Sequence, residues 1–313
     1  MKLNPKTAAF LFPGQGSQTI GMGKALADEF ADAKALFDEA DSILGFSLSS
    51  LMWNGPEADL NDTVNTQPAL FLHSYISFQT FAGLFPGFEP ASVAGHSLGE
   101  LSALSAAGAL SFADGLRLVR KRGELMKRAG ELAPGSMAAI LGVDIPTLDK
   151  VCAEASTPDE IVQVANDNCP GQVVISGAKT AVERAMAGAK AAGAKRAMPL
   201  AVSIAAHSPL MGSIQDEWNQ AVDAVAMNAP KIPVIGNVHA SVLKTADDCR
   251  ADIKAQMQSR VKWTESIKVM SEMGIRSFIE VGTGTVLGGL VKRITGDAAN
   301  YPLGNPQDFK ALE

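Results

Sequence analysis

A five-residue pattern, Gly95-His96-Ser97-Leu98-Gly99, constrains the fold of this chain more than any other segment. It fits G-x-S-x-G, with a short apolar run, Ser92–Ala94, before it and a helical stretch of small residues, Leu98–Ala107, after it. In that context the turn is so sharp that glycine is needed on both sides, and the serine hydroxyl stands exposed at a helix N-terminus. The helix dipole and the free N–H groups there favour developing negative charge. The pattern therefore predicts that Ser97 is a nucleophile, and a chance glycine-rich turn is the alternative.

The rest of the chain alternates short apolar runs with amphipathic stretches, which predicts an α/β fold with a mostly parallel sheet. The strands expected in the main part are Ala8–Phe12, Ser92–Ala94, Ile232–Val238 and Arg276–Val281. Its expected helices are Met22–Asp41, Thr66–Gly83, Leu98–Ala107, a helix capped by Ser111 that runs to about Ala129, Trp263–Met273 and Thr285–Ile294.

The middle of the chain has a different order of elements, β-α-β-β-α-β, which is typical of ferredoxin-like units. The expected elements are Ser136–Val143, Pro146–Ala155, Val162–Asn166, Gln172–Ser176, Thr180–Ala192 and Arg196–Ser203. We therefore expect a ferredoxin-like subdomain over residues 131–204, inserted into a discontinuous core of residues 1–130 and 205–313.

Composition excludes several classes of protein. Of the 313 residues, 47% are hydrophobic and 19% charged, which is typical of a globular chain rather than a disordered one. The net charge of −6 argues against nucleic-acid binding, which needs a basic face to pair with phosphates. The three cysteines are sparse and lack metal-ligand spacing, so we expect no disulfide framework, no metal site and a reducing compartment.

Neither a signal peptide nor a membrane span is expected. The apolar run Ala8–Phe12 stops at Pro13-Gly14, which is too short for a signal-peptide core. The longest uncharged run, Thr63–Phe88, contains polar residues and prolines, so a buried helix is expected there. These features predict a cytoplasmic protein.

A serine nucleophile needs a base, and the chain has four histidines. His207 follows the last strand of the expected insert, where the chain returns to the main part, and clefts between such parts favour ligand sites. His239 follows another expected strand and is its rival. His73 lies in an apolar stretch and is expected in the core. His96 adjoins Ser97 on a tight turn, so its side chain should point away and pack beside the site.

Arg122 is the one charged residue on the apolar stripe of the helix predicted after Ser111. The apolar residues of that stripe are Leu118, Val119, Leu125 and Met126. Arginine is rarely buried unless paired, because an unpaired buried charge is costly. Either a core Asp or Glu pairs with Arg122, or its partner arrives with the substrate. A guanidinium suits a carboxylate, because its fork donates two parallel hydrogen bonds.

Two glycine-containing loops have different interpretations. The first, Phe12–Gln18, follows a strand, and in serine acyl-transfer folds a second loop supplies an oxyanion donor. The N–H groups of Gln15 and Leu98 are the candidates; a phosphate loop is excluded because no Gly-Lys-Ser/Thr follows. The second loop, Gly282–Gly288, has its third glycine one residue late for a dinucleotide fingerprint, and the required βαβ context is missing.

Together, several motifs resemble the malonyl-CoA:acyl carrier protein transacylases of bacterial fatty-acid synthesis. They are Phe12-Pro-Gly-Gln-Gly-Ser-Gln18, Gly95-His-Ser-Leu-Gly-Glu100, Arg122-Gly123, Asn166, His207-Ser-Pro-Leu-Met211 and Glu280-Val-Gly-Thr-Gly284, in this order. The resemblance spans about Ala8 to Ile294 and implies a hydrolase-like α/β core with a ferredoxin-like insert.

The resemblance also implies roles for individual residues. Ser97 would be the nucleophile and His207 the base, in preference to His239, while Gln15 and Leu98 would supply the oxyanion N–H groups. Arg122 would bind the malonyl carboxylate. Three further site residues are implied: Gln256, whose backbone carbonyl would orient the histidine, and Asn166 and His96, which would bind substrate.

The implied reaction transfers malonyl from malonyl-CoA to the phosphopantetheine thiol of an acyl carrier protein through a malonyl-serine ester. No cofactor, metal, nucleic acid or membrane is implied, and a monomer is compatible with the sequence. A serine thioesterase acting on acyl-CoA, a non-catalytic acyl-CoA binding module and a polyketide pathway stay open. Ala205-Ala206 stands where many relatives have a bulky residue before the histidine, and His239 where relatives often have an acidic one.

Overall fold

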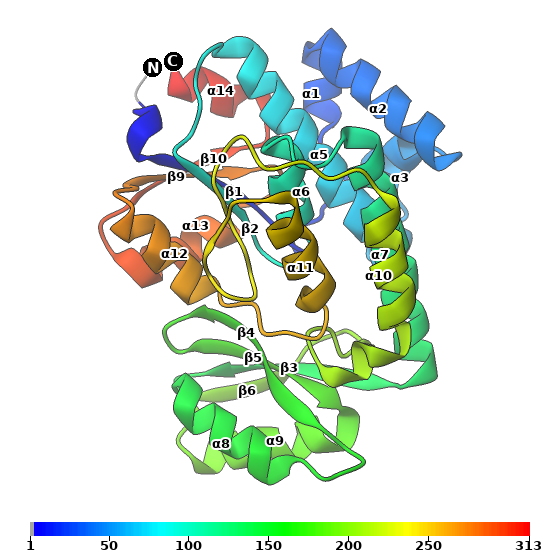
Figure 1. The fold of residues 1–313 in the computed structure, drawn as a ribbon, viewed down its shortest axis with the longest axis vertical. Coiled ribbons are helices and arrows are strands. Elements are labelled where there is room, and N and C mark those ends of the chain that lie inside the picture. The colour runs from blue at the N-terminus through cyan, green and yellow to red at the C-terminus, as the bar shows by residue number, and fades with distance from the viewer. Residues whose placement is uncertain (1–2) are drawn as a thin grey trace.

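The computed structural model describes residues 3–313, which form two parts, each built on its own sheet (Figure 1). The larger sheet has the order β10-β9-β1-β2-β7-β8, and every strand pair in it is parallel except β7–β8. Its strands are β1 (Ala8–Phe12), β2 (Ser92–Gly95), β7 (Val234–Ile235), β8 (Val242–Leu243), β9 (Ser277–Val281) and β10 (Ala299–Leu303). The central strand β1 is buried along its whole length, as expected for a parallel sheet covered on both faces.

The smaller sheet is antiparallel, with the order β4-β5-β3-β6. Its elements are β3 (Gly135–Leu141), α8 (Ile145–Ala155), β4 (Val162–Cys169), β5 (Gln172–Ala178), α9 (Lys179–Ala191) and β6 (Arg196–Pro199). This is the β-α-β-β-α-β order predicted from the sequence, and all six elements lie within residues 131–204. The domain limits at residues 130 and 205 stay a prediction.

Alternation along the strands gives the small sheet two different faces. Ala138 and Ile140 pack with residues of α8 and α9 in one apolar cluster. Met137, Ala139 and Val174 face the opposite way and line a cavity against the larger part. Figure 1 shows α8 and α9 on the outer side of this sheet, so its inner face is the one turned toward β1 and β2.

The remaining helices surround the larger sheet. Those before the small sheet are η1 (Pro5–Thr7), α1 (Lys24–Glu29), α2 (Ala31–Leu44), α3 (Leu48–Asn54), α4 (Glu57–Leu60), α5 (Thr63–Leu84), α6 (Gly99–Ala106) and α7 (Phe112–Leu132). Those after it are η2 (Pro209–Ile214), α10 (Gln215–Ala224), α11 (Ala246–Gln256), α12 (Trp263–Glu272), α13 (Val286–Thr295) and α14 (Pro306–Leu312). Within residues 3–313, no helix is long and apolar enough to cross a membrane.

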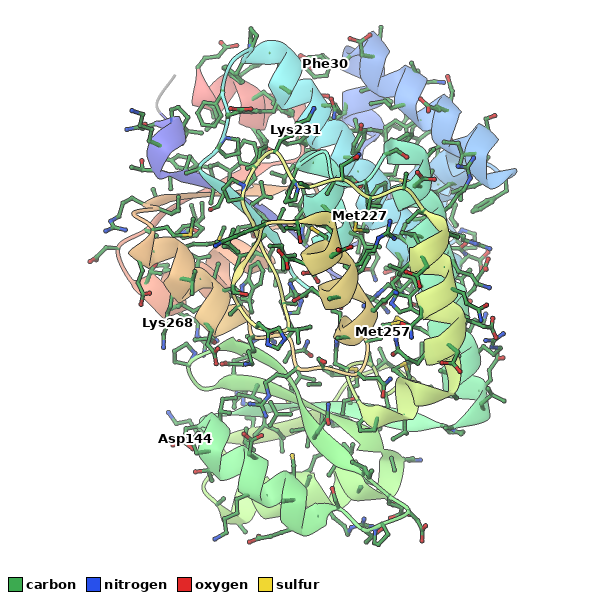
Figure 2. The ribbon with its side chains drawn as sticks, in the orientation of Figure 1. Phe30, Asp144, Met227, Lys231, Met257 and Lys268 are labelled. Atoms are coloured by element: carbon green, nitrogen blue, oxygen red, sulfur yellow. The ribbon has the colours of Figure 1, made fainter. Side chains whose placement is uncertain are left out.

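Three expected elements are broken or shortened in the structure, while the helix expected from Thr66 begins at Thr63 and the strand expected over Val162–Asn166 extends to Cys169. The helix expected over Met22–Asp41 is two helices, because the backbone of Phe30, labelled in Figure 2, is extended between α1 and α2. The centroid of the Phe30 ring lies 6.0 Å from that of Phe309. The strand expected over Ile232–Val238 is only Val234–Ile235, because the chain turns away from the sheet at Gly236 and Asn237. The strand expected over Arg196–Ser203 ends at Pro199.

Candidate active site

The elbow at Ser97 joins β2 to α6 in a conformation that depends on its two flanking glycines. A Cβ atom on Gly95 would lie 1.9 Å from the carbonyl carbon of Gly99, and one on Gly99 would lie 2.0 Å from the carbonyl oxygen of Phe12. Ser97 itself has a φ of 53°, in the left-handed region that non-glycine residues rarely adopt. The local sequence thus fixes a strained turn that presents one hydroxyl.

The Ser97 hydroxyl is paired with a histidine that comes from 110 residues further along the chain. Its Oγ atom lies 2.7 Å from Nε2 of His207. Nδ1 of His207 lies 2.9 Å from the backbone carbonyl oxygen of Gln256. A carbonyl oxygen only accepts hydrogen bonds, so Nδ1 carries the proton and Nε2 is free to accept one from Ser97.

The environment keeps His207 neutral. Its side chain is buried, and burial together with the positive charge of Arg122 lowers its pKa to about 3. At neutral pH the imidazole is therefore unprotonated and able to act as a base. The arrangement is a Ser–His pair oriented by a main-chain acceptor.

Arg122 lies on the buried stripe of α7, as predicted, and is only 2% exposed. Its Nη1 donates to Oε1 of Gln67 (2.9 Å), and its Nη2 donates to Oε1 of Gln256 (2.8 Å) and to Oγ of Ser97 (3.2 Å). Its Nε has no hydrogen-bond partner among the described residues.

No carboxylate pairs directly with Arg122 within residues 3–313; Glu100 reaches it only through Gln256. Burial lowers the pKa of Arg122 to about 10, an effect that the charge of Glu100 opposes. The guanidinium therefore stays charged at neutral pH, beside the nucleophile and without a direct counter-ion.

A cavity of about 330 Å³ opens over Ser97, between the elbow and the inner face of the small sheet. Its polar lining comes from Gln15, His96, Ser97, Arg122, Asn166, Asn168, Gln172 and His207. Its apolar lining comes from Leu98, Met126, Met137, Ala139, Val174, Leu200, Val202, Ile204 and Ala206. The cavity thus combines one cation and one candidate nucleophile with several polar side chains and an apolar wall, as is typical of small-molecule sites.

The two expected oxyanion donors both border this cavity. Within the described part of the chain, neither the N–H of Gln15 nor that of Leu98 donates to a protein acceptor. The side chain of Gln15 is held by Thr63, whose Oγ1 donates to its Oε1 at 2.9 Å. Two main-chain donors are therefore available on the Ser97 side of the cavity.

His96 and Asn166 also lie on the cavity wall. His96 is held in place rather than free, because its Nε2 lies 2.8 Å from Oδ1 of Asn168 and its ring packs edge-on against Trp263. Burial lowers the pKa of His96, so this ring is neutral as well. Asn168 was missed from the sequence, although its position two residues after Asn166 on β4 was a signal for it.

The other two histidines do not line the cavity over Ser97. His73 is buried, with Nδ1 2.5 Å from Oγ1 of Thr283 and Nε2 2.9 Å from the carbonyl oxygen of Gly304, in the core position predicted for it. His239 is exposed on the loop after β7 and is not part of the cavity lining. Among the four histidines, only His207 contacts the Ser97 hydroxyl.

A second set of buried polar residues lies behind the elbow and was not predicted as part of the site. Asn237, Glu100 and Asp252 are at most 4% exposed. Burial and the adjacent charge of Asp252 raise the pKa of Glu100 well above its usual range. The side chain of Gln256 donates to Glu100 and, at 2.9 Å, to the carbonyl oxygen of Ser97. The signal in the sequence was a lone carboxylate, Glu100, within a helix of small residues.

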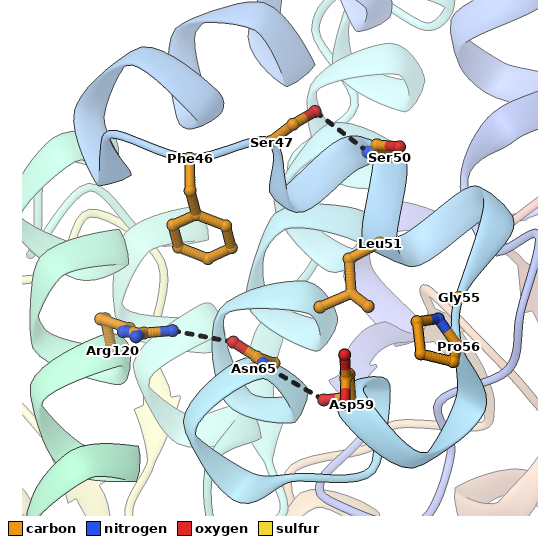
Figure 3. A pocket seen from close by; sticks show the side chains of 9 residues that line it. All are labelled: Phe46, Ser47, Ser50, Leu51, Gly55, Pro56, Asp59, Asn65 and Arg120. Carbon is orange, nitrogen blue, oxygen red and sulfur yellow. Dashed lines mark hydrogen bonds between the residues drawn. The ribbon is translucent and has the colours of Figure 1, made fainter.

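A separate surface hollow of about 450 Å³ lies between α3 and α7 (Figure 3). Its one cation, Arg120, is already engaged: Nη1 donates to Oδ1 of Asn65 (2.8 Å) and Nε to Oε1 of Glu124 (2.8 Å). The guanidinium also lies over the ring of Phe46. No nucleophile–base pair borders this hollow among the described residues, so the cavity at Ser97 is the candidate active site.

Comparison with known proteins agrees with this geometry. Residues 9–301 match the model of the acyl transferase domain family. The chain is 46% identical over 304 residues to the malonyl CoA-acyl carrier protein transacylase of Bacillus subtilis, covering 96% of this chain and 95% of that protein.

Solved structures give the same result. An acyl carrier protein S-malonyltransferase from Vibrio cholerae superposes with a TM-score of 0.94 at 42% identity, covering 98% of this chain and 100% of that one. A malonyl-transacylase in complex with its type II polyketide acyl carrier protein superposes with a TM-score of 0.93 at 40% identity, covering 97% and 98% of the two chains.

Proposed function

This chain belongs to the acyl transferase family, and we propose that it transfers malonyl from malonyl-CoA to the phosphopantetheine thiol of an acyl carrier protein. The observation that carries the choice of acyl group is the guanidinium of Arg122, 3.2 Å from Oγ of Ser97 and without a direct counter-ion. A malonyl group brings a carboxylate to this position, whereas an acetyl group does not, and the arginine fork matches a carboxylate.

In the first half-reaction, His207 Nε2 accepts the Ser97 proton as Oγ attacks the thioester carbonyl carbon. The N–H groups of Gln15 and Leu98 stabilise the oxyanion, and the carbonyl oxygen of Gln256 stabilises the imidazolium through Nδ1–H. The C–S bond breaks, His207 returns its proton to the sulfur, and CoA leaves. Ser97 then carries malonyl as an ester.

In the second half-reaction, the phosphopantetheine thiol gives its proton to His207 and attacks the ester carbonyl. The C–O bond breaks, and the proton on His207 returns to Ser97. Two half-reactions through one covalent intermediate give ping-pong kinetics. Thioester exchange changes no oxidation state, and the proposal includes no cofactor.

The proposed setting is the cytoplasm, where the reaction supplies the extender unit for fatty-acid synthesis. All three cysteines are free and buried, which suits a reducing compartment. A relative at 40% identity forms a complex with a polyketide carrier protein, so the choice of pathway depends on the carrier that this chain meets.

Intact mass after mixing with malonyl-CoA alone tests the proposal. We expect one malonyl group on the wild type and none on Ser97→Ala, because the ester needs the hydroxyl. Persistent labelling of Ser97→Ala would overturn the assignment of the nucleophile. Release of free malonate without an acceptor would favour the alternative, a serine thioesterase.

A matched pair of histidine variants tests the base. We expect His207→Ala to lose about 10²- to 10⁴-fold in acyl transfer, the usual contribution of general base catalysis. His239→Ala should retain its activity, because this exposed residue lies outside the cavity lining. Equal losses in both folded variants would leave the base unassigned.

A further inference from the structure

The side chain of Asn237 binds both ends of the elbow. Its Oδ1 accepts a hydrogen bond from the backbone N–H of Ser97 at 2.8 Å. Its Nδ2 donates to the backbone carbonyl oxygen of Gly95 at 2.7 Å. One amide group therefore spans the turn from the end of β2 to the nucleophile, across 140 residues of sequence.

This bridge determines which backbone N–H groups face the substrate. Because Asn237 accepts from the N–H of Ser97, that donor is already engaged and is not available to an oxyanion. The next N–H, that of Leu98, has no protein acceptor among the described residues and is left for the oxyanion. The bridge also joins the residues on either side of His96, where the chain enters the strained φ of 53° at Ser97.

Asn237 is itself held by three separate parts of the structure. Its backbone N–H donates to Oε1 of Glu100 on α6 and to Oδ2 of Asp252 on α11, both at 3.1 Å. Its carbonyl oxygen accepts from the N–H of Lys262 at 3.0 Å. The residue is 1% exposed, and a Cβ on the preceding Gly236 would lie 2.7 Å from Oδ1 of Asp252. The loop cannot move from the two carboxyl groups without breaking these bonds.

We propose that Asn237 is a positioning residue for the reaction, which holds the Ser97 elbow in its reactive conformation and keeps the Leu98 N–H directed at the oxyanion. Glu100 and Asp252 act as its anchor, since they fix its backbone from two helices. This inference rests on Ser97 as the nucleophile and not on the identity of the acyl group.

The test uses a fluorophosphonate, which labels a reactive serine whatever its natural substrate. We expect Asn237→Ala to lower the labelling rate of Ser97 by about ten- to a hundredfold, as a displaced reacting group does. The KM for malonyl-CoA should stay within about twofold of wild type, because Arg122 and the apolar wall are unchanged. His239→Ala, an exposed change on the same loop, is the control and should label at the wild-type rate.

A second variant keeps the proposal testable if Asn237→Ala fails to fold. Asn237→Asp is isosteric: when protonated, the new carboxyl group accepts from Ser97 N–H and donates to Gly95, whereas the ionised form cannot donate. Glu100 from α6 and Asp252 from α11 contact this residue, Lys262 at the start of α12 donates its N–H to the Asn237 carbonyl, and His239 lies exposed on the loop itself. Burial beside two carboxyl groups raises the pKa of a third.

The labelling rate of Asn237→Asp relative to wild type should therefore increase as the pH is lowered from about 8 to about 6. A ratio that stays constant with pH, or a folded Asn237→Ala that labels at the wild-type rate, would overturn the inference. Acylation of the wild type by malonyl-CoA tests the proposed function separately from the role of Asn237. If the wild type is labelled by the fluorophosphonate but not acylated by malonyl-CoA, the proposed function is rejected. The role of Asn237 is then still decided by the labelling rates of Asn237→Ala and Asn237→Asp.

Discussion

At the scale of single residues, we propose that the charge on Arg122 selects the acyl group that the site accepts. The side chain is 2% exposed, and its fork contacts two amide oxygens and one hydroxyl but no carboxylate among the described residues. A bound malonyl carboxylate would provide the missing negative charge. An acetyl group would leave the guanidinium buried and unneutralised, which is unfavourable.

Arg122→Ala should therefore reverse the acyl preference. Removing one partner of a buried pair costs about 3–5 kcal/mol, so malonyl transfer should decrease by some hundreds-fold or more. Acetyl transfer should hold steady or increase, because the unneutralised charge is gone. The ratio of kcat/KM for malonyl-CoA and acetyl-CoA measures this directly. If the folded variant keeps the wild-type ratio, Arg122 is a structural residue and another group binds the carboxylate.

The lowered pKa of His207 predicts an unusual pH profile. A free histidine gains its proton near pH 6.5, but burial and Arg122 lower the pKa of His207 to about 3. His207, the proposed base, should therefore stay neutral well below pH 6.5. The acylation rate with malonyl-CoA should not decline there, as pre-steady-state labelling at a series of pH values can show. A decline centred near pH 6.5 would contradict the buried, neutral histidine.

The lowered pKa of His207 also makes the stability of the fold depend on pH. Between pH 6.5 and about 3 the unfolded chain binds a proton at this histidine and the folded chain does not. The free energy of unfolding therefore increases with pH across that window, and the contribution present above pH 6.5 is lost as the pH falls.

At the scale of elements, β1, β2 and α6 meet so closely that a single methyl group should separate them. A Cβ on Gly99 would lie 2.0 Å from the carbonyl oxygen of Phe12, which is backbone and cannot move aside. Gly99→Ala should therefore destabilise the fold by at least about 1–3 kcal/mol, as overpacking does, and abolish labelling of Ser97. Gly289→Ala is the matched control, because its Cβ would meet no atom within 4 Å.

In that control a helical glycine becomes alanine, which should be neutral or stabilising by up to about 1 kcal/mol. Thermal unfolding measures the melting temperatures of Gly99→Ala and Gly289→Ala, and we expect that of Gly99→Ala to be the lower. Equal melting temperatures would mean that the elbow can accommodate a side chain, against the geometry described here.

The sequence predicted elements well where burial is periodic. The strand at Ala8–Phe12 was predicted with the observed limits, and the helix after Ser111 with the observed start and Arg122 on its buried stripe. The short helices α3, α4, α10, α11 and α14 were missed, although α11 and α14 begin with local capping boxes at Thr245 and Asn305. The break at Phe30 was missed as well, because the helical pattern continues on both sides of it.

The residues of the site also differ in how well the sequence predicted them. Ser97 was predictable from a local motif, whereas the choice of His207 over His239 needed a resemblance to a family. Asn237 was missed because its partners, Gly95 and Ser97, lie about 140 residues away, and no periodicity reports such a contact. Sequence patterns indicate which side chains are buried, but not which distant backbone groups they bind.

At the scale of the whole molecule, the distribution of positive charge separates two candidate surfaces for a carrier protein. Lys127 and Arg128 on α7 form ion pairs with Asp62 and Glu217, each at 2.5 Å. The second surface lies on the part of the molecule built on the smaller sheet, and it comprises Lys190, Lys195 and Arg196. These three are exposed and form no ion pair within residues 3–313. The surface formed by Lys190, Lys195 and Arg196 is therefore the stronger candidate for docking a carrier protein.

If an acidic carrier protein docks there, its KM should increase with ionic strength while the KM for malonyl-CoA changes less. Charge reversal at Lys195 and Arg196 should raise the KM for the carrier more than reversal at Lys127 and Arg128. Steady-state kinetics over a salt series tests both expectations. A carrier KM that is independent of salt up to about 0.5 M, where surface charges are screened, would argue against electrostatic docking.

The single cavity above Ser97 has a consequence for how flux through this protein is governed. In the proposed reaction the donor thioester and the acceptor thiol use the same hydroxyl and the same imidazole in turn. The thioester bond that is broken in the donor is of the same kind as the thioester bond that is made on the acceptor. Because one thioester is exchanged for another, the equilibrium constant should be close to one, and the reaction should run readily in both directions. Loaded carrier would be unloaded by excess CoA through the same serine ester. The protein thus equilibrates two pools, and the downstream consumer of malonyl carrier sets the direction in which acyl groups move.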